Sequence, residues 1–268
     1  MIDRGRHNVL GVRVHAVDDH AAADRILRAA RDGQPLAASA LAVHGVMTGT
    51  LDATHRHRLN KLDLLVPDGQ PVRWALNWLY GVNLRERVYG PDLMLELCRR
   101  AAEQRMPVYL FGGSEALLES LSARLVEQIS GLEIAGRKAS RFRTLSADER
   151  RELVDEIRAS GARLAFVGIG CPRQEVFVYE LRDQLPMPLV AVGAAFAFHA
   201  GQLRQAPAWI QRRGLEWLFR LATEPRRLWK RYLLLNPLYV ALLACQAANV
   251  YRIDPDDSRP PQTEICYG

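Results

Sequence analysis

Cysteine is scarce in this sequence, and the cysteines that occur are far apart. Cys98, Cys171, Cys245 and Cys266 form no CxxC pair, so neither a disulfide framework nor a thiolate zinc site is indicated. This usage of cysteine favours a reducing compartment such as the cytosol. No HExxH motif or carboxylate cluster accompanies the histidines, and we therefore expect no metal site.

Uninterrupted apolar runs and export signals are also lacking. No apolar segment with a small-residue cleavage site follows the N-terminus, so a signal peptide is not indicated. The most apolar stretch, residues 232–251, is interrupted by Asn236, Pro237, Gln246 and Asn249. Three arrangements stay open for it: a helix lying on a membrane surface, a buried helical hairpin, or a membrane span. Basic and aromatic residues just before it favour the membrane surface.

Two motifs of nucleotide-dependent enzymes are missing. The GxGxxG fingerprint is incomplete, because Arg173 stands where the glycines at 168 and 170 would require a third. The chain also contains no GxxxxGK[ST] phosphate loop. A nicotinamide-dependent oxidoreductase and a P-loop nucleotidase are therefore unsupported, and we expect no cofactor.

The sequence does contain a regular alternation of short apolar runs and amphipathic segments over residues 1–206. With 49% hydrophobic and 25% charged residues, a disordered, collagenous or multi-span membrane protein is excluded. The alternation predicts an α/β fold with a Rossmann-like, mainly parallel sheet flanked by helices. Expected strands are residues 8–14, 35–43, 62–66, 108–111, 132–135, 164–167 and 189–192. Expected helices include residues 91–105, 115–130, 147–160 and 174–185.

The alternation stops near Pro207 and gives way to a helical, basic appendage. We place this appendage at residues 207–252 and expect the polar tail, residues 253–268, to be disordered. Residues 203–232 have a net charge of +6, equal to that of the whole chain. This local surface should attract phosphates or anionic lipid, whereas the neutral remainder argues against a nucleic-acid partner. Its basic residues are Arg204, Arg212, Arg213, Arg220, Arg226, Arg227, Lys230 and Arg231.

In doubly wound sheets, ligands bind beyond the carboxyl ends of the strands, so the turns after the expected strands are candidate sites. Asp68 lies in such a turn, Pro67-Asp68-Gly69, and is either a general base or the cap of the next helix. The turn Phe111–Ser114 offers backbone N–H groups at a helix N-terminus, where a phosphate can bind. Both signals are weak when taken alone.

Two further turns carry candidate groups. Residues 168–175 (GIGCPRQE) combine glycines that let a ligand approach the backbone with a proline suited to the first helical turn. Cys171 in this turn is either a nucleophile or a packed small residue. Residues 193–201 are small and apolar apart from His199, which is either a proton donor or base or a structural histidine.

Together these turns resemble the WecG/TagA/CpsF glycosyltransferases, also called glycosyltransferase family 26. The resemblance covers residues 8–239 and rests on a specific order of motifs. These are PDG at 67–69, ERVYGPDL at 86–93, VYLFGG at 108–113, GIGCPRQE at 168–175, VGAAF at 192–196, and the Arg- and Trp-rich run at 206–232.

The resemblance implies an inverting, metal-independent enzyme. Family members transfer an N-acetylmannosamine-type or related sugar from a UDP-sugar to a polyprenyl-diphosphate-linked acceptor, in cell-surface polysaccharide biosynthesis. They act peripherally at the inner face of the cell membrane, and some form homo-oligomers. The basic appendage is expected to close over the active site and to engage the membrane and the lipid diphosphate.

The resemblance also assigns roles to residues of this chain. Asp68 matches the catalytic base, and Arg87 and Gln174 match other active-site groups. We expect Glu216 and Arg220 to form an i, i+4 ion pair. The expected donor-binding residues are Ser39, Gly112, Gly113, Ser114, Gly170, Pro172 and Glu175. The expected ligands of the acceptor diphosphate are Arg212, Arg213, Arg220, Arg226, Arg227 and Arg231.

The chain departs from the family pattern at two positions. Leu41 replaces the asparagine of a Thr-x-Asn segment, in which Ser39 keeps the hydroxyl, and Ala197 replaces an aspartate. Each change removes a polar contact, so either the donor sugar differs or catalysis is weakened. The departures leave room for an alternative function, a non-catalytic protein of the same fold that binds a nucleotide sugar or a lipid diphosphate.

Overall fold

A six-stranded parallel sheet forms the centre of the protein. The computed structural model describes residues 1–268, apart from the side chain of Arg231. The sheet has the order β4-β3-β8-β7-β5-β6, and every neighbouring pair is parallel. The α/β expectation is thereby confirmed. The strands are β3 (Leu36–Leu41), β4 (Leu64–Pro67), β5 (Val108–Phe111), β6 (Ile134–Lys138), β7 (Leu164–Val167) and β8 (Pro188–Ala191).

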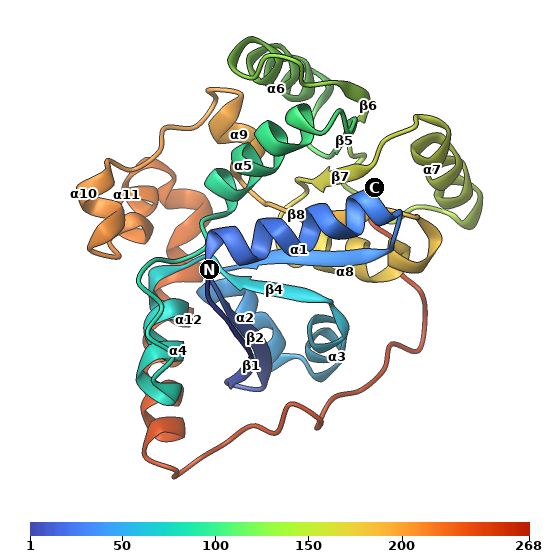
Figure 1. The fold of residues 1–268 in the computed structure, drawn as a ribbon. Coiled ribbons are helices and arrows are strands. Elements are labelled where there is room, and N and C mark those ends of the chain that lie inside the picture. Colours follow the sequence, from blue (N-terminus) through green and yellow to red (C-terminus); the bar gives the residue numbers. More distant parts are fainter.

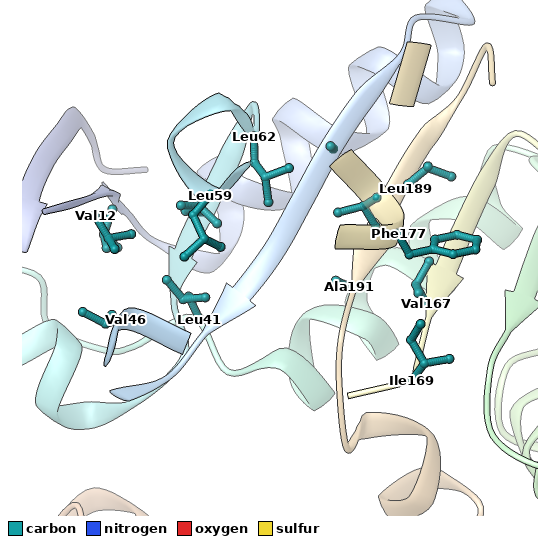
Figure 2. Packing of buried hydrophobic residues seen from close by; sticks show 14 of the residues in the cluster. Val12, Leu41, Val46, Leu59, Leu62, Val167, Ile169, Phe177, Leu189 and Ala191 are labelled. Carbon is teal, nitrogen blue, oxygen red and sulfur yellow. The ribbon is translucent and has the colours of Figure 1, made fainter. Parts of the chain in front are cut away.

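Helices cover both faces of this sheet, which explains why its central strands read as continuous apolar runs. Successive residues alternate between two cores: Tyr109 and Phe111 enter one, and Val108 and Leu110 enter the other. In the first core the rings of Phe111 and Phe177 stack at 4.4 Å, and Figure 2 shows the packing around Phe177.

The first core lies under α2 (Val43–Leu51), α3 (Ala53–Lys61), α4 (Gln70–Tyr80), α7 (Ala147–Ala159) and α8 (Arg173–Leu181), which a short 3-10 turn (Arg182–Gln184) follows. The second core lies under α1 (Asp19–Asp32), α5 (Gly90–Glu103), α6 (Glu115–Gln128) and α9 (Ala195–His199). Figure 1 shows the arrangement of these helices around the sheet. Loops at the carboxyl edge of the sheet are thus held from both sides.

The N-terminal segment corrects one expectation. Residues 8–14, expected as one strand, contain the end of β1 (Asp3–Val9), a turn, and the start of β2 (Val12–Val17), which pair as an antiparallel hairpin. Leu10 and Gly11 form its two-residue turn with φ of 52° and 88°, the left-handed geometry that hairpin turns favour. Leucine is an unusual residue for that geometry, so the sequence pattern concealed the turn.

The appendage consists of α10 (Ala208–Arg212), α11 (Glu216–Thr223) and α12 (Pro225–Ala247). Helix α12 lies beside α4 and is one continuous helix, which excludes the helical hairpin (Figure 1). Its Tyr239 and Leu243 enter the first core, and its Gln246 accepts from the Leu10 N–H at 2.9 Å. Of the helices described, none combines the length and apolarity needed to cross a bilayer.

The C-terminal tail also differs from expectation. Residues 253–268, expected to be disordered, run along the α/β core to α7 (Figure 1). Arg56 and Asn60 donate to the carbonyl oxygens of Asp257 and Pro255, and Cys266 is buried. Because the core supplies partners for the tail's backbone, a polar composition alone did not indicate its conformation.

Candidate active site

The carboxyl ends of β3, β4, β7 and β8 surround a cavity of about 630 Å³, which we call the edge cavity. Asp68, Gln174, Glu175 and Gly193 line it from the core, and Arg220 lines it from the appendage. Such an edge, where the chain changes direction across the sheet, is where ligands bind in doubly wound folds. The topology thus brings together residues from the turns that follow β4, β7 and β8.

Asp68 follows β4 and faces the start of α5. Its Oδ1 accepts from the Gly90 N–H at 2.7 Å, whereas the cap of α4 is Gly69, without a side-chain bond. The helix-cap alternative is therefore wrong. Burial raises the pKa of Asp68 to about 6, although Arg87 and the Gly90 N–H lower it. A carboxyl group with this pKa is ionised at neutral pH and still basic enough to accept a proton.

Arg87 is buried and joins the core to the appendage. Its Nη2 donates to Glu216 Oε2 at 2.6 Å and to Gln211 Oε1 at 3.0 Å. Its guanidinium lies 4.0 Å from the ring centroid of Tyr89, whose hydroxyl donates to Glu216 Oε1 at 3.0 Å. Burial opposes the charge of Arg87, but Asp68 and Glu216 nevertheless raise its pKa. Arg87 is thus a fixed positive charge beside Asp68.

The expected ion pair between Glu216 and Arg220 is wrong. Glu216 stands at the first position of α11 and turns to Arg87, while Arg220 Nη2 lies 3.6 Å from Glu224. Helical spacing offered Glu216 only Arg220 as a partner, because spacing cannot show contacts with other elements. The buried partner on the loop before α5 contributes more, because it is screened less by water.

A buried polar network lies on the other side of the edge cavity. Glu175 is 0% exposed, and its Oε1 accepts from Ser39 Oγ and from Gln174 Nε2, each at 2.8 Å. Glu175 Oε2 and Gln174 Oε1 have no hydrogen-bond partner within the described part of the chain. Two buried acceptors without partners are costly unless a ligand donates to them. Both residues line the edge cavity.

The glycine turns divide between the cavity and the packing of the core. Gly113 and Gly170 line the edge cavity, with φ of 69° and 81°. Gly112 allows the β5 and β7 turns to approach, since a Cβ there would lie 2.7 Å from the Gly168 carbonyl oxygen. Ser114 Oγ accepts from the Leu117 N–H at 3.2 Å and caps α6. The cavity wall does not include Gly112, Ser114 or the exposed Pro172.

The appendage arginines are placed unequally. Arg220 lines the edge cavity and a second, larger cavity, which Arg213 also lines. Arg227 lines the edge cavity and lies 2.8 Å from Glu224. Arg212 and Arg226 are exposed and line neither cavity. The side chain of Arg231 lies outside the described residues.

The two other candidates from the turns, His199 and Cys171, each contact another part of the core. His199 Nε2 lies 2.9 Å from the Pro91 carbonyl oxygen, and burial lowers the pKa of the imidazole, so this side chain ties α9 to α5. Cys171 Sγ lies 3.7 Å from Nδ1 of His44. His44, Tyr89 and Glu216 also line the edge cavity, although none was predicted as a site residue. Tyr89 lies within the ERVYGPDL motif, and Glu216, in the run at 206–232, was expected only as a partner of Arg220.

Two comparisons with known proteins give matches. Residues 7–252 match the model of the glycosyl transferase WecG/TagA/CpsF family. A protein of Bacillus spizizenii, an N-acetylglucosaminyldiphosphoundecaprenol N-acetyl-beta-D-mannosaminyltransferase, is 31% identical to this chain over 192 residues. That alignment covers 71% of this chain and 72% of the relative.

Proposed function

The chain belongs to the WecG/TagA/CpsF glycosyl transferase family, and we propose that it transfers an N-acetylmannosamine-type or related sugar from a UDP-sugar. The acceptor is a polyprenyl-diphosphate-linked sugar, as the name of the Bacillus relative suggests, and the product enters a cell-surface polysaccharide. One observation carries this proposal above all: Asp68, whose pKa burial raises to about 6, and the buried cation Arg87 line the same larger cavity.

Direct displacement at an anomeric carbon explains why these two groups are needed. Asp68 takes the proton of the acceptor hydroxyl as its oxygen attacks, and the configuration of the sugar inverts. The bond to the UDP oxygen breaks at the same time, so negative charge develops on the departing diphosphate. Arg87, held beside Asp68, supplies positive charge for it without needing to reorganise.

The buried network of Gln174 and Glu175 supports a role in holding the donor sugar. Their free oxygens accept hydrogen bonds, so they match the hydroxyl or amide N–H groups of an N-acetylated sugar. Leu41 is buried in the core and Ala197 lines the cavity, which leaves this part of the wall apolar. The donor is therefore a sugar with fewer polar contacts at that wall than the family pattern supplies.

The appendage supports peripheral binding at the inner face of the cell membrane. Trp209, Leu218 and Trp229 expose large apolar surfaces among its arginines. Aromatic and aliphatic side chains interleaved with cations suit the boundary between headgroups and acyl chains. The acceptor is anchored in that boundary, so this placement brings the edge cavity to it.

A test is the release of UDP from a panel of UDP-sugars, with a short-chain polyprenyl-diphosphate sugar as acceptor. Activity with one donor should fall by roughly 10²- to 10⁴-fold in Asp68→Asn, the usual contribution of a general base, while UDP-sugar affinity persists. If no donor turns over and both proteins bind UDP-sugar equally, the second candidate, a binding protein of this fold, replaces the enzyme. The loss of polar groups at Leu41 and Ala197 is the observation that favours that candidate.

A further inference from the structure

The larger of the two cavities is a groove between α4 and α12, which we call the helix groove. Its volume of about 1040 Å³ lies at the upper end of the range for small-molecule sites, roughly 300–1,000 Å³. Trp74 and Trp78 form one wall, and Leu233, Pro237 and Val240 form the other. The groove is therefore apolar along most of its length.

One end of the helix groove is charged. Asp68, Arg87 and Glu216 lie there, and Arg213 and Arg220 line the same end from the loop before α11 and from α11 itself. The edge cavity shares Asp68, Glu216 and Arg220 with it. An occupant of the helix groove thus reaches the proposed catalytic carboxylate with its head while its body lies between α4 and α12.

The walls of the groove are held in place by the fold. Tyr239 is buried and donates to the Pro71 carbonyl oxygen at 3.1 Å, fixing α12 to the start of α4. Gly214 lies against Trp74, where a Cβ would come within 2.4 Å of the ring. A preformed groove binds a flexible chain at a lower entropic cost than one that must first assemble.

The apolar side chains of the groove are left exposed. Trp78 is 61% exposed, Leu233 57% and Val240 63%. A contiguous apolar surface of this kind marks a site for an apolar ligand or partner. Because the surface leads into a cluster of cations beside Asp68, the fitting ligand has an apolar chain and an anionic head.

We propose that the helix groove binds the isoprenoid chain of the lipid-linked diphosphate acceptor. This inference rests on the proposed function and adds a chain-binding site to it. The diphosphate lies at Arg213 and Arg220, the acceptor sugar lies toward Asp68, and the first isoprene units lie between Trp78 and the α12 side chains. The groove then selects lipid-linked acceptors over soluble sugar diphosphates.

Chain-length dependence of the acceptor KM provides the first test. In detergent without vesicles, KM should fall as the isoprenoid chain of the acceptor lengthens. Leu233→Gln and Val240→Gln should each raise KM for long-chain acceptors roughly tenfold and leave KM for a chainless acceptor unchanged. Leu234→Gln is the matched control, because Leu234 is exposed on the same helix and does not line the groove.

Direct binding provides a second test that needs no turnover. Farnesyl diphosphate should change the fluorescence of the groove tryptophans and bind more tightly than farnesol or inorganic diphosphate. Leu233→Gln should weaken the binding of farnesyl diphosphate and leave the affinity for inorganic diphosphate unchanged. Circular dichroism melting of each variant shows that a weakened affinity does not reflect unfolding.

The two tests separate failure of the groove from failure of the proposed function. If transfer occurs with one KM for all chain lengths in every variant, the groove assignment is wrong and the transferase stands. If no acceptor is glycosylated but farnesyl diphosphate binding depends on Leu233, the groove stands and the transferase fails. A self-association lost in Leu233→Gln but kept in Leu234→Gln would instead identify a second copy as the occupant and overturn the proposal.

Discussion

The carboxyl edge of the sheet and the appendage hold their polar groups in opposite ways. At the edge, Glu175 and Gln174 are buried and bond to each other, and short loops between strand and helix fix their positions. In the appendage, Arg227 is exposed and lies against a neighbouring glutamate of its own segment. The edge thus offers preset geometry, and the appendage offers charge on helices that pack through fewer buried side chains.

This difference suits two tasks of the proposed function. Positioning a sugar for displacement requires groups held within a fraction of an ångström, which buried networks provide. Binding the diphosphate of a lipid substrate requires charge that can adjust, which exposed arginines provide. Glu216 connects the two regions, because this appendage residue bonds to Arg87 and Tyr89 of the core.

The largest effect should come from the buried side of the comparison. Glu175→Ala removes the acceptor of Ser39 and Gln174, leaving two buried donors unpaired. We expect a loss of about 2–5 kcal/mol in the free energy of unfolding, measured with urea. Glu175→Gln keeps an oxygen for those donors, so it should lose less than about 1 kcal/mol.

The same pair of variants separates folding from donor recognition. Glu175→Gln places an N–H where the free Oε2 lies, so the donor KM should rise by roughly 10- to 100-fold with stability kept. A wild-type donor KM in Glu175→Gln would show that Oε2 does not contact the donor. The buried network at the sheet edge would then serve the packing of the fold and not the binding of the donor.

A second prediction concerns the residue that joins the two regions. Because the pKa of Asp68 is about 6, kcat/KM should fall about tenfold per pH unit below pH 6, as the base becomes protonated. Glu216→Gln removes a negative neighbour and releases Arg87, so the pKa of Asp68 should fall and this acid limb should move to lower pH. Loss of the Arg87 pair should also reduce kcat/KM by roughly tenfold at neutral pH.

Tyr89→Phe is the matched control for the pH profile. It removes the hydroxyl that donates to Glu216 but changes no charge near Asp68. Its acid limb should therefore stay in place even if its rate falls. If the acid limb of the pH profile does not move in Glu216→Gln, this appendage residue does not influence the pKa of Asp68.

These regions also differ in how much the sequence predicted. The parallel strands of the core were located within a few residues, because each is a short apolar run bounded by turn residues. The turns that follow them supplied Asp68, Gln174 and Glu175, which the topology then brought to one cavity. Local pattern was sufficient for these strands, because the burial of each one follows from its own apolar residues.

The rest required long-range contacts that no local pattern contains. The tail is ordered against Arg56 and Asn60, about 200 residues away in the sequence. Glu216 finds Arg87 across 129 residues, so helical spacing suggested the wrong partner. The hairpin turn places Leu10 in a left-handed conformation that leucine seldom adopts.

The smallest effect should come from the appendage side of the comparison. Arg220 lines both cavities, so Arg220→Gln should raise the acceptor KM by roughly five- to tenfold, and less so in high salt, which screens the lost charge. Arg204→Gln removes the same charge from an exposed position that lines neither cavity, and should change KM less than about twofold. Equal effects of both variants would mean that the appendage attracts its acceptor through net charge alone. In that case its helices need no defined position over the edge cavity, and the two regions would be coupled only through Glu216.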